Sequence, residues 1–166
     1  MEEADMERDS LVPESVAQHP SCVLIKLGQV VYQHTEQRLA ALGLRTRHYT
    51  LLSVLDAEGP MAQQELSRRA GIDPTTVVAC IDDLEEAELA GRSRDPADRR
   101  RSVVTLTAAG TVVLAEARAL LDDLDRDTFA DLTPSQVRDL SSLLTILNSS
   151  SALTGPPTQV KPGRAE

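Results

Sequence analysis

The stretch from Asp73 to Gly110 constrains the fold more than any other part of this sequence. Asp73 can accept hydrogen bonds from the free amides at the start of a helix, and Pro74 suits the first helical position because its fixed φ matches a helix. Apolar residues then recur at helical spacing: Val77, Ile81, Leu84 and Leu89. The sequence therefore predicts an amphipathic helix that starts at Pro74 and buries this apolar face.

A hairpin is predicted directly after this helix. Arg92–Arg94 and Ser102–Leu106 flank a turn sequence at 95–98, Asp-Pro-Ala-Asp, and arginines crowd its tip. A preceding short helix, about Ala62–Ala70, is closed by Gly71, so two helices are joined through a tight glycine-containing turn. A helix-turn-helix followed by a basic hairpin is a winged helix-turn-helix, which predicts contact with DNA.

The charge distribution is compatible with this interpretation. The chain carries a net charge of −9, yet residues 92–101 hold five arginines against two aspartates, whereas residues 1–14 hold six carboxylates against one arginine. A basic hairpin on an acidic body can bind phosphates, although the body adds repulsion.

The composition narrows the class of protein further. Hydrophobic residues make up 41% and aromatic residues 2%, so the core must be aliphatic, and the abundance of Leu, Val and Ala favours helices. Cys22 and Cys80 lie far apart, which argues against a disulfide scaffold. The N-terminus lacks the apolar run of a signal peptide, and the uncharged residues 140–160 are interrupted too often for a membrane span. We expect a cytoplasmic protein without membrane contact.

The sequence predicts a mainly α fold with a small β-hairpin wing and with dimerisation helices at both ends. Five regions follow in order: a disordered acidic arm (1–18), an N-terminal dimerisation helix (19–45), the winged helix-turn-helix (46–107), C-terminal dimerisation helices (108–148) and a disordered tail (149–166). Within them, a helix from about Pro20 to Leu42, a helix from Thr46 to Asp56 and caps at Thr107 and Thr133 are expected. The terminal helices carry long aliphatic stripes that one protomer cannot cover, so a symmetric homodimer is expected.

These residues resemble the MarR family of winged helix-turn-helix bacterial transcription regulators, over about Val23 to Leu147. Asp98-Arg99-Arg100, followed by Leu106-Thr107 and Gly110, is similar to the family's wing signature, and the segment from Asp73 to Val77 resembles the start of its recognition helix. The resemblance implies an obligate dimer that binds a pseudo-palindromic double-stranded DNA operator. It also implies release by a small, often phenolic, effector bound between the lobe and the dimer platform.

The candidate DNA contacts fall into three groups. In the recognition helix they are Thr75, Thr76, Val78 and Ala79. In the wing they are Arg92, Arg94, Asp98, Arg99, Arg100 and Arg101. By matching position the resemblance implies that Asp98 and Arg100 interact to fix the hairpin, and that a wing arginine enters the minor groove. Candidates for the DNA backbone are Arg45, Arg47, Arg68 and Arg69, which could equally pair with surface carboxylates.

The sequence departs from the family pattern at Ala62, Ala79, Asp83, Glu88 and Gly91. Ala79 and Asp83 replace residues that are frequently basic in the recognition helix, and Glu88 replaces a common helix-ending glycine. These departures bear on operator sequence and affinity more than on the fold.

Other candidate sites are weaker. By family analogy His34, His48 and Tyr49 could line a ligand pocket, whereas the histidines show no metal-ligand spacing, so no metal is predicted. Cys22 lies near the position of the reactive cysteine of some peroxide-sensing relatives, but the supporting tyrosines are absent, so a buried, inert thiol is favoured over redox sensing. Cys80 should lie in the core.

No catalytic constellation or cofactor motif is present in the sequence, so an enzyme is not expected. We predict a dimeric, sequence-specific transcriptional regulator, a repressor, with a possible small-molecule effector. The alternatives are a winged-helix module for protein contacts or a cysteine-based redox-sensing regulator. The first alternative is favoured by the carboxylates of the recognition helix, Asp82, Asp83, Glu85 and Glu86.

Overall fold

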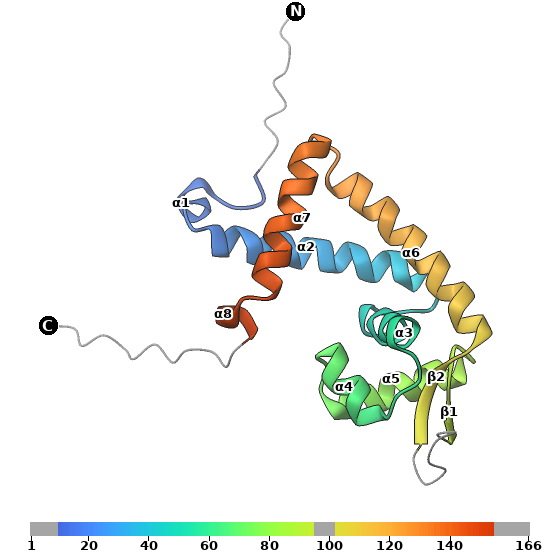
Figure 1. Ribbon diagram of the computed structural model, residues 1–166. Helices are drawn as coiled ribbons and strands as arrows, with labels where there is room; N and C mark the ends of the chain where they lie inside the picture. Colours follow the sequence, from blue (N-terminus) through green and yellow to red (C-terminus); the bar gives the residue numbers. More distant parts are fainter. Residues whose placement is uncertain (1–9, 95–101, 155–166) are drawn as a thin grey trace, which may run out of the picture. The chain divides into compact units, whose positions relative to one another are not determined.

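The computed structural model describes residues 10–94 and 102–154, and its contacts divide the chain into two compact units at Asp125 and Arg126 (Figure 1). The described elements are α1 (Glu14–Ala17), α2 (Pro20–Ala40), α3 (Thr46–Glu58), α4 (Gln63–Ala70), α5 (Pro74–Glu86), β1 (Ala90–Arg94), β2 (Ser102–Leu106), α6 (Ala108–Thr128), α7 (Pro134–Asn148) and α8 (Ser151–Thr154). The fold is mainly helical with one small antiparallel sheet, as the sequence predicted.

The helix-turn-helix forms through the local signals seen in the sequence. α4 ends at Gly71, whose φ of 65° lies in the left-handed region that glycine tolerates. The buried Ser67 hydroxyl donates to the carbonyl of Ile72 (2.6 Å) and holds this turn. Asp73 then caps α5, because its Oδ1 accepts a hydrogen bond from the amide of Thr76 at 2.9 Å. The predicted start of the recognition helix is therefore confirmed.

The hairpin pairs β1 with β2 in antiparallel register, with Arg92 opposite Val104. Its first strand begins two residues earlier than predicted, at Ala90. Met61 extends the sheet, because its amide and carbonyl exchange hydrogen bonds with Val104 at 3.2 and 2.8 Å. The linker between α3 and α4 is thus attached to the base of the hairpin. The hairpin tip lies outside the described residues.

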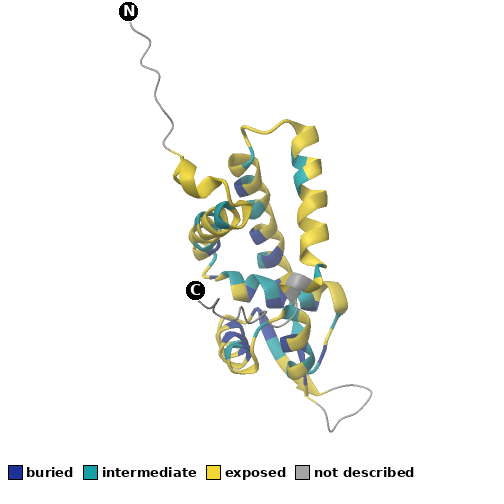
Figure 2. Ribbon diagram, turned by 90° about the vertical axis from the view of Figure 1, so that its left-hand side faces the viewer, coloured by how far each residue is buried: buried dark blue, intermediate teal, exposed yellow. Residues whose placement is uncertain are grey.

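An aliphatic core joins α5 to the helices around it (Figure 2). The predicted apolar row is buried, with relative exposures between 0 and 7% for Val77, Ile81, Leu84 and Leu89, although α5 ends at Glu86 and Leu89 lies beyond it. The largest fully buried side chains elsewhere are Leu39, Leu51, Leu52, Leu66, Val104 and Leu114. The recognition helix therefore has one side buried in the core and one side exposed to solvent.

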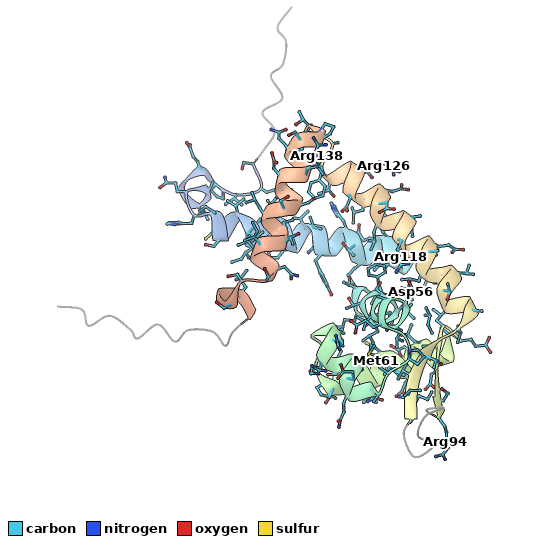
Figure 3. The ribbon with its side chains drawn as sticks, viewed as in Figure 1. Asp56, Met61, Arg94, Arg118, Arg126 and Arg138 are labelled. Atoms are coloured by element: carbon cyan, nitrogen blue, oxygen red, sulfur yellow. The ribbon has the colours of Figure 1, made fainter. Side chains whose placement is uncertain are left out.

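α6 is fixed to the helix-turn-helix at its first turn and again further along. The Thr107 hydroxyl accepts from the amide of Gly110 (2.9 Å), as predicted for a cap, and donates to the carbonyl of Glu88 (2.8 Å). Further along, Arg118 donates to the Asp56 carboxylate of α3 at 2.8 Å (Figure 3). The Thr107 bonds connect the start of α6 to the segment that follows the recognition helix, and the bond between Arg118 and Asp56 connects α6 to α3.

Several predicted boundaries need correction. Glu14–Ala17 form α1 within the segment assigned to a disordered arm, because the carbonyl of Pro13 accepts hydrogen bonds from Val16 and Ala17. Ser151–Thr154 form α8 within the segment assigned to a disordered tail. Helices of four residues carry no readable periodicity, so the sequence missed both. The rest of the predicted arm and tail lies outside the described residues.

Two longer helices also differ slightly from prediction, since α2 ends at Ala40 rather than near Leu42 and α3 continues to Glu58 rather than Asp56. Within the described residues, no helix has the length and apolarity needed to cross a bilayer.

Replacing Glu88 with glycine is expected to stabilise the protein. Glu88 ends the recognition helix with a φ of 58°, a conformation that costs an L-residue about 1–2 kcal/mol, whereas glycine adopts it freely. The extra freedom of glycine in the unfolded chain offsets part of this, so the net gain should be about 1 kcal/mol in the free energy of unfolding. Urea denaturation followed by circular dichroism measures it. Gly71→Ala is the reciprocal control and should cost about 1 kcal/mol, because Gly71 has a φ of 65°. If both substitutions changed the free energy of unfolding in the same direction and by the same amount, the φ values would not be the cause.

Candidate nucleic-acid interface

The candidate contacts on α5 lie on its exposed side. Thr75 and Ala79 are exposed, Thr76 is half-buried, and 40% of Val78 is accessible. The amide of Thr76 is occupied by Asp73. The Thr76 side chain, this amide bond and the nearby Arg47 together lower the pKa of Asp73. A carboxylate therefore stands where a phosphate would otherwise meet the helix amides, so any phosphate contact here must come from side chains.

Two arginines at the start of α3 lie beside this end of α5. Arg45 and Arg47 share a cavity of about 290 Å³ with residues of the recognition helix. The residues that line it are Arg45, Arg47, His48, Thr75, Thr76, Ala79, Cys80 and Asp83. The fold thus brings together two candidate sets that lie almost thirty residues apart in sequence, the backbone arginines and the hydroxyl residues. The result is a pair of arginines beside the start of the recognition helix, next to the carboxylates of Asp73 and Asp83.

His48 links α3 to α5 at the floor of this cavity. Only 5% of His48 is exposed; its Nδ1 accepts from the Arg45 amide (3.3 Å), and its Nε2 lies 3.3 Å from Asp83 Oδ2. Burial lowers the pKa of His48, although the Asp83 carboxylate acts in the opposite direction. A neutral ring with its proton on Nε2 satisfies both contacts. His48 therefore holds Asp83 against α3.

The structure does not bring His34, His48 and Tyr49 together at this cavity. His34 is exposed on α2, and Tyr49 packs against the hydrophobic core; neither lines the cavity that contains His48. Neighbouring residues of an α-helix point about 100° apart, so His48 and Tyr49 face different surroundings.

Arg92, one of the candidate wing contacts, lies where β1 meets α5. Its guanidinium donates to Asp82 Oδ1 at 2.8 Å and forms an ion pair with Glu85, and its amide donates to Glu85 Oε1 at 2.7 Å. The side chain is therefore occupied by carboxylates of the recognition helix. Arg94 is exposed at the end of β1, next to the hairpin tip (Figure 3). The other wing candidates, Asp98, Arg99, Arg100 and Arg101, lie outside the described residues.

The arginines of α4 are paired with carboxylates, which is one of the two alternatives left open by the sequence. Arg68 and Arg69 both bond to Glu65, and Arg69 Nη1 also lies 3.1 Å from Glu58. The hydrogen bonds from Arg68 and Arg69 lower the pKa of Glu65 to about 2. Exposed pairs of this kind contribute little to stability and can exchange partners.

The cysteines differ from each other in exposure. Cys80 is buried as expected, and burial raises the pKa of its thiol, which disfavours the reactive thiolate. Cys22 is half-buried, so the expectation of a fully buried thiol is wrong for a single protomer. Among the described residues, no group of three or more His, Cys, Asp or Glu side chains is arranged to hold a metal ion.

The sequence missed several residues that shape the site. Glu36 of α2 accepts a hydrogen bond from the Thr46 amide at 2.7 Å, which fixes the start of α3. The Thr46 side chain, followed by this amide, lowers the pKa of Glu36. Asp82 and Glu85 were interpreted only as an acidic surface, whereas they hold Arg92. In each case the partners lie on different elements, so no local pattern could have identified them.

Comparison with known proteins places the fold and the site in context. The family model described as MarR family matches residues 44–102. The HTH-type transcriptional repressor Rv2887 of Mycobacterium tuberculosis is 28% identical over 127 residues, which cover 76% of this chain and 91% of that protein.

Two solved structures are also similar to this chain. The structure of CouR from Rhodococcus jostii bound to p-coumaroyl-CoA has a TM-score of 0.70 at 25% identity and covers 90% of this chain and 100% of that one. The M. tuberculosis Rv2887 complex with p-aminosalicylic acid has a TM-score of 0.65 at 26% identity and covers 78% of this chain and 98% of that one.

Proposed function

Because the chain belongs to the MarR family of winged helix-turn-helix transcription regulators, we propose that it is a dimeric repressor that binds a pseudo-palindromic DNA operator. One observation carries this proposal. The exposed side of α5 is flanked at its start by Arg45 and Arg47, and the hairpin follows directly after its end. A helix flanked by cations in this way can enter the major groove while the arginines contact the phosphates on its border.

The contacts proposed for α5 are small and mostly uncharged. Val78 and Ala79 offer methyl groups to thymine, and the Thr75 and Thr76 hydroxyls can bond to base edges or phosphates. Arg94 and the arginines of the hairpin tip are the candidates for the minor groove, whose negative potential attracts arginine. Sequence preference would then come from shape and methyl contacts more than from charged readout.

Dimerisation is proposed through the terminal helices. In the described protomer, α2 leaves Leu24, Ile25, Leu27 and Tyr32 between 43 and 62% exposed. On α7, Leu143, Leu144, Ile146 and Leu147 are between 42 and 64% exposed. Apolar rows of this size on two helices are unusual for a monomer and are characteristic of surfaces that a partner covers.

A small acidic effector is proposed for the cavity at the start of α5. The related structures contain p-aminosalicylic acid or p-coumaroyl-CoA. Arg45 and Arg47 would pair with a carboxylate, and a ring beside Thr76 and Ala79 would occupy the side of α5 that we assign to DNA. Binding of effector and operator would then be mutually exclusive.

The salt dependence of binding tests the DNA interface. We expect footprinting of the DNA flanking the gene to show a protected pseudo-palindrome whose log affinity falls linearly with log salt. The double variant Arg45→Gln/Arg47→Gln removes four proposed phosphate contacts from the dimer, two in each protomer. It should reduce that slope by about 3.6, because each phosphate contact contributes a slope of about 0.9, and lower the affinity about 10- to 100-fold at low salt.

Lys26→Gln, which removes a positive charge from α2 instead, is the control and should leave the slope unchanged. Absence of protection by the wild-type protein even at low salt would overturn the repressor proposal. It would favour a winged-helix module for protein contacts.

A further inference from the structure

The recognition helix and the hairpin are connected by a second link besides the chain itself. Glu85 accepts both the amide of Arg92, at 2.7 Å, and its guanidinium. The other side of the guanidinium bonds to Asp82 at 2.8 Å. One arginine of β1 is therefore held by two carboxylates that lie three residues apart on α5, which places them on the same face of the helix.

This link differs from the other ion pairs on the surface of the molecule. The Arg92 and Glu85 side chains are 32% and 30% exposed, whereas Arg68 of α4 is 70% exposed. A main-chain donor is also involved, so Glu85 fixes the backbone of β1 and not only a flexible side chain. Gln63 at the start of α4 accepts from the same guanidinium at 3.5 Å. Arg92 thus lies where α4, α5 and β1 meet.

The geometry changes the effect that the acidic residues on α5 are expected to have on DNA binding. As bare charges, Asp82 and Glu85 would repel DNA, and their removal would strengthen binding. Held against Arg92, they are instead partly neutralised and orient the strand that leads into the hairpin. The two interpretations predict opposite signs for the same substitution.

We propose that Asp82 and Glu85 are positioning residues for DNA binding, which hold Arg92 and thereby set the hairpin at a fixed angle to the recognition helix. The proposal rests on the DNA-binding function proposed above. Simultaneous contact with the major groove by α5 and with the minor groove by the hairpin requires such a fixed angle. Removing Asp82 or Glu85 leaves the contact surfaces of α5 and the hairpin present but no longer aligned. The affinity for DNA therefore falls, although the protein has become less negative.

The test uses the full chain and a DNA duplex that the wild-type protein selects from a randomised pool. Glu85→Gln is expected to weaken binding at least about 5-fold, and Asp82→Asn/Glu85→Gln about 30-fold, the size of loss found when one or two charge-assisted bonds are broken. Glu86→Gln removes the same charge from the next residue, which does not bond to Arg92 in the structure, and should leave binding unchanged or slightly tighter. Tighter binding by Glu85→Gln would overturn the proposal.

A salt series separates positioning from phosphate contact. Arg92→Gln should weaken binding to a similar degree at every salt concentration, with the slope of log affinity against log salt unchanged. A slope reduced by about two, from one lost contact in each protomer of the dimer, would identify Arg92 as a phosphate contact and would contradict the assignment. The charge-reversed pair Glu85→Arg/Arg92→Glu should recover part of the affinity lost by either single reversal; no recovery would also count against the link.

Amide hydrogen exchange, measured without DNA, tests the link between α5 and β1 independently of the proposed function. In Glu85→Gln, the amides of β1 and β2 should exchange hydrogen faster than in the wild type, while those of α6 keep their wild-type rates. This comparison also reveals a variant that has unfolded as a whole, since α6 would then exchange faster as well. Unchanged exchange in the hairpin would refute the link even if the protein binds DNA. Faster exchange in a protein that binds no DNA would refute only the function.

Discussion

Replacing Gly110 with alanine is expected to lower the free energy of unfolding by at least about 3 kcal/mol, at the upper end of the range for overpacked sites. A Cβ atom at this position would lie 2.0 Å from the carbonyl oxygen of Leu89 and 2.8 Å from the Leu106 side chain. The nearest obstacle is backbone, which cannot rotate away as a side chain can. The first turn of α6 would have to separate from the end of the recognition helix, and the Thr107 bonds would be lost with it. Thermal unfolding should show a Tm about 10 °C below that of the wild type.

Two other glycines provide matched controls. Nothing lies within 4 Å of a Cβ added at Gly28 on α2 or at Gly91 on β1. Gly28→Ala should be neutral or stabilising by up to about 1 kcal/mol, because alanine is the better helix former. If Gly110→Ala unfolds within 1 °C of these controls, the close contact with Leu89 does not exist in solution.

The starts of α5 and α7 could be predicted from the sequence because their signals are local. Asp73 and Thr133 both accept the expected hydrogen bonds from residues three positions later, and Gln136 Oε1 accepts a hydrogen bond from the Thr133 amide at 2.8 Å. A cap needs only the residues of one turn, so tertiary structure cannot easily override it. The hairpin was predictable for the same reason.

The partners of the arginines could not be predicted. The chain holds 26 carboxylates against 17 Lys and Arg residues, so the sequence offers many candidate partners for every arginine. Which one it meets depends on how separate elements pack. Arg92 meets Glu85 only because the turn after α5 directs β1 back along the helix, and Arg45 lies near Thr75 only because α3 packs on α5.

The same argument explains why composition misleads about the recognition helix. Four carboxylates on α5 favour a surface that avoids DNA when they are counted as charges. In the structure, Asp82 and Glu85 bind Arg92, and Asp83 lies beside His48. Glu86 is the remaining carboxylate of that group. Net charge therefore describes the electrostatics of this helix poorly, because a carboxylate that is paired with a cation repels DNA less than an unpaired one.

Placing a charge on the exposed apolar row of α7 is expected to have the largest effect on operator binding. Leu143→Asp/Ile146→Asp changes two side chains that are 59% and 64% exposed in the protomer, so the fold itself should survive. If α7 forms part of the dimer interface, the buried charges would dissociate the dimer, because an unpaired carboxylate is costly to bury. Sedimentation should then show a monomer.

Loss of the dimer would weaken binding to the complete operator by at least about 100-fold, because the second recognition helix would no longer be held one helical turn away on the same duplex. Binding to a single half-site should remain close to that of one wild-type lobe, since Arg45, Arg47 and α5 are untouched. Val112→Asp is the matched control, because Val112 is 60% exposed on α6, outside the proposed interface. This variant should remain dimeric and bind the operator like the wild type. A double variant that remains dimeric would place the interface away from this row of α7, and a Val112 variant that dissociates would move it to α6.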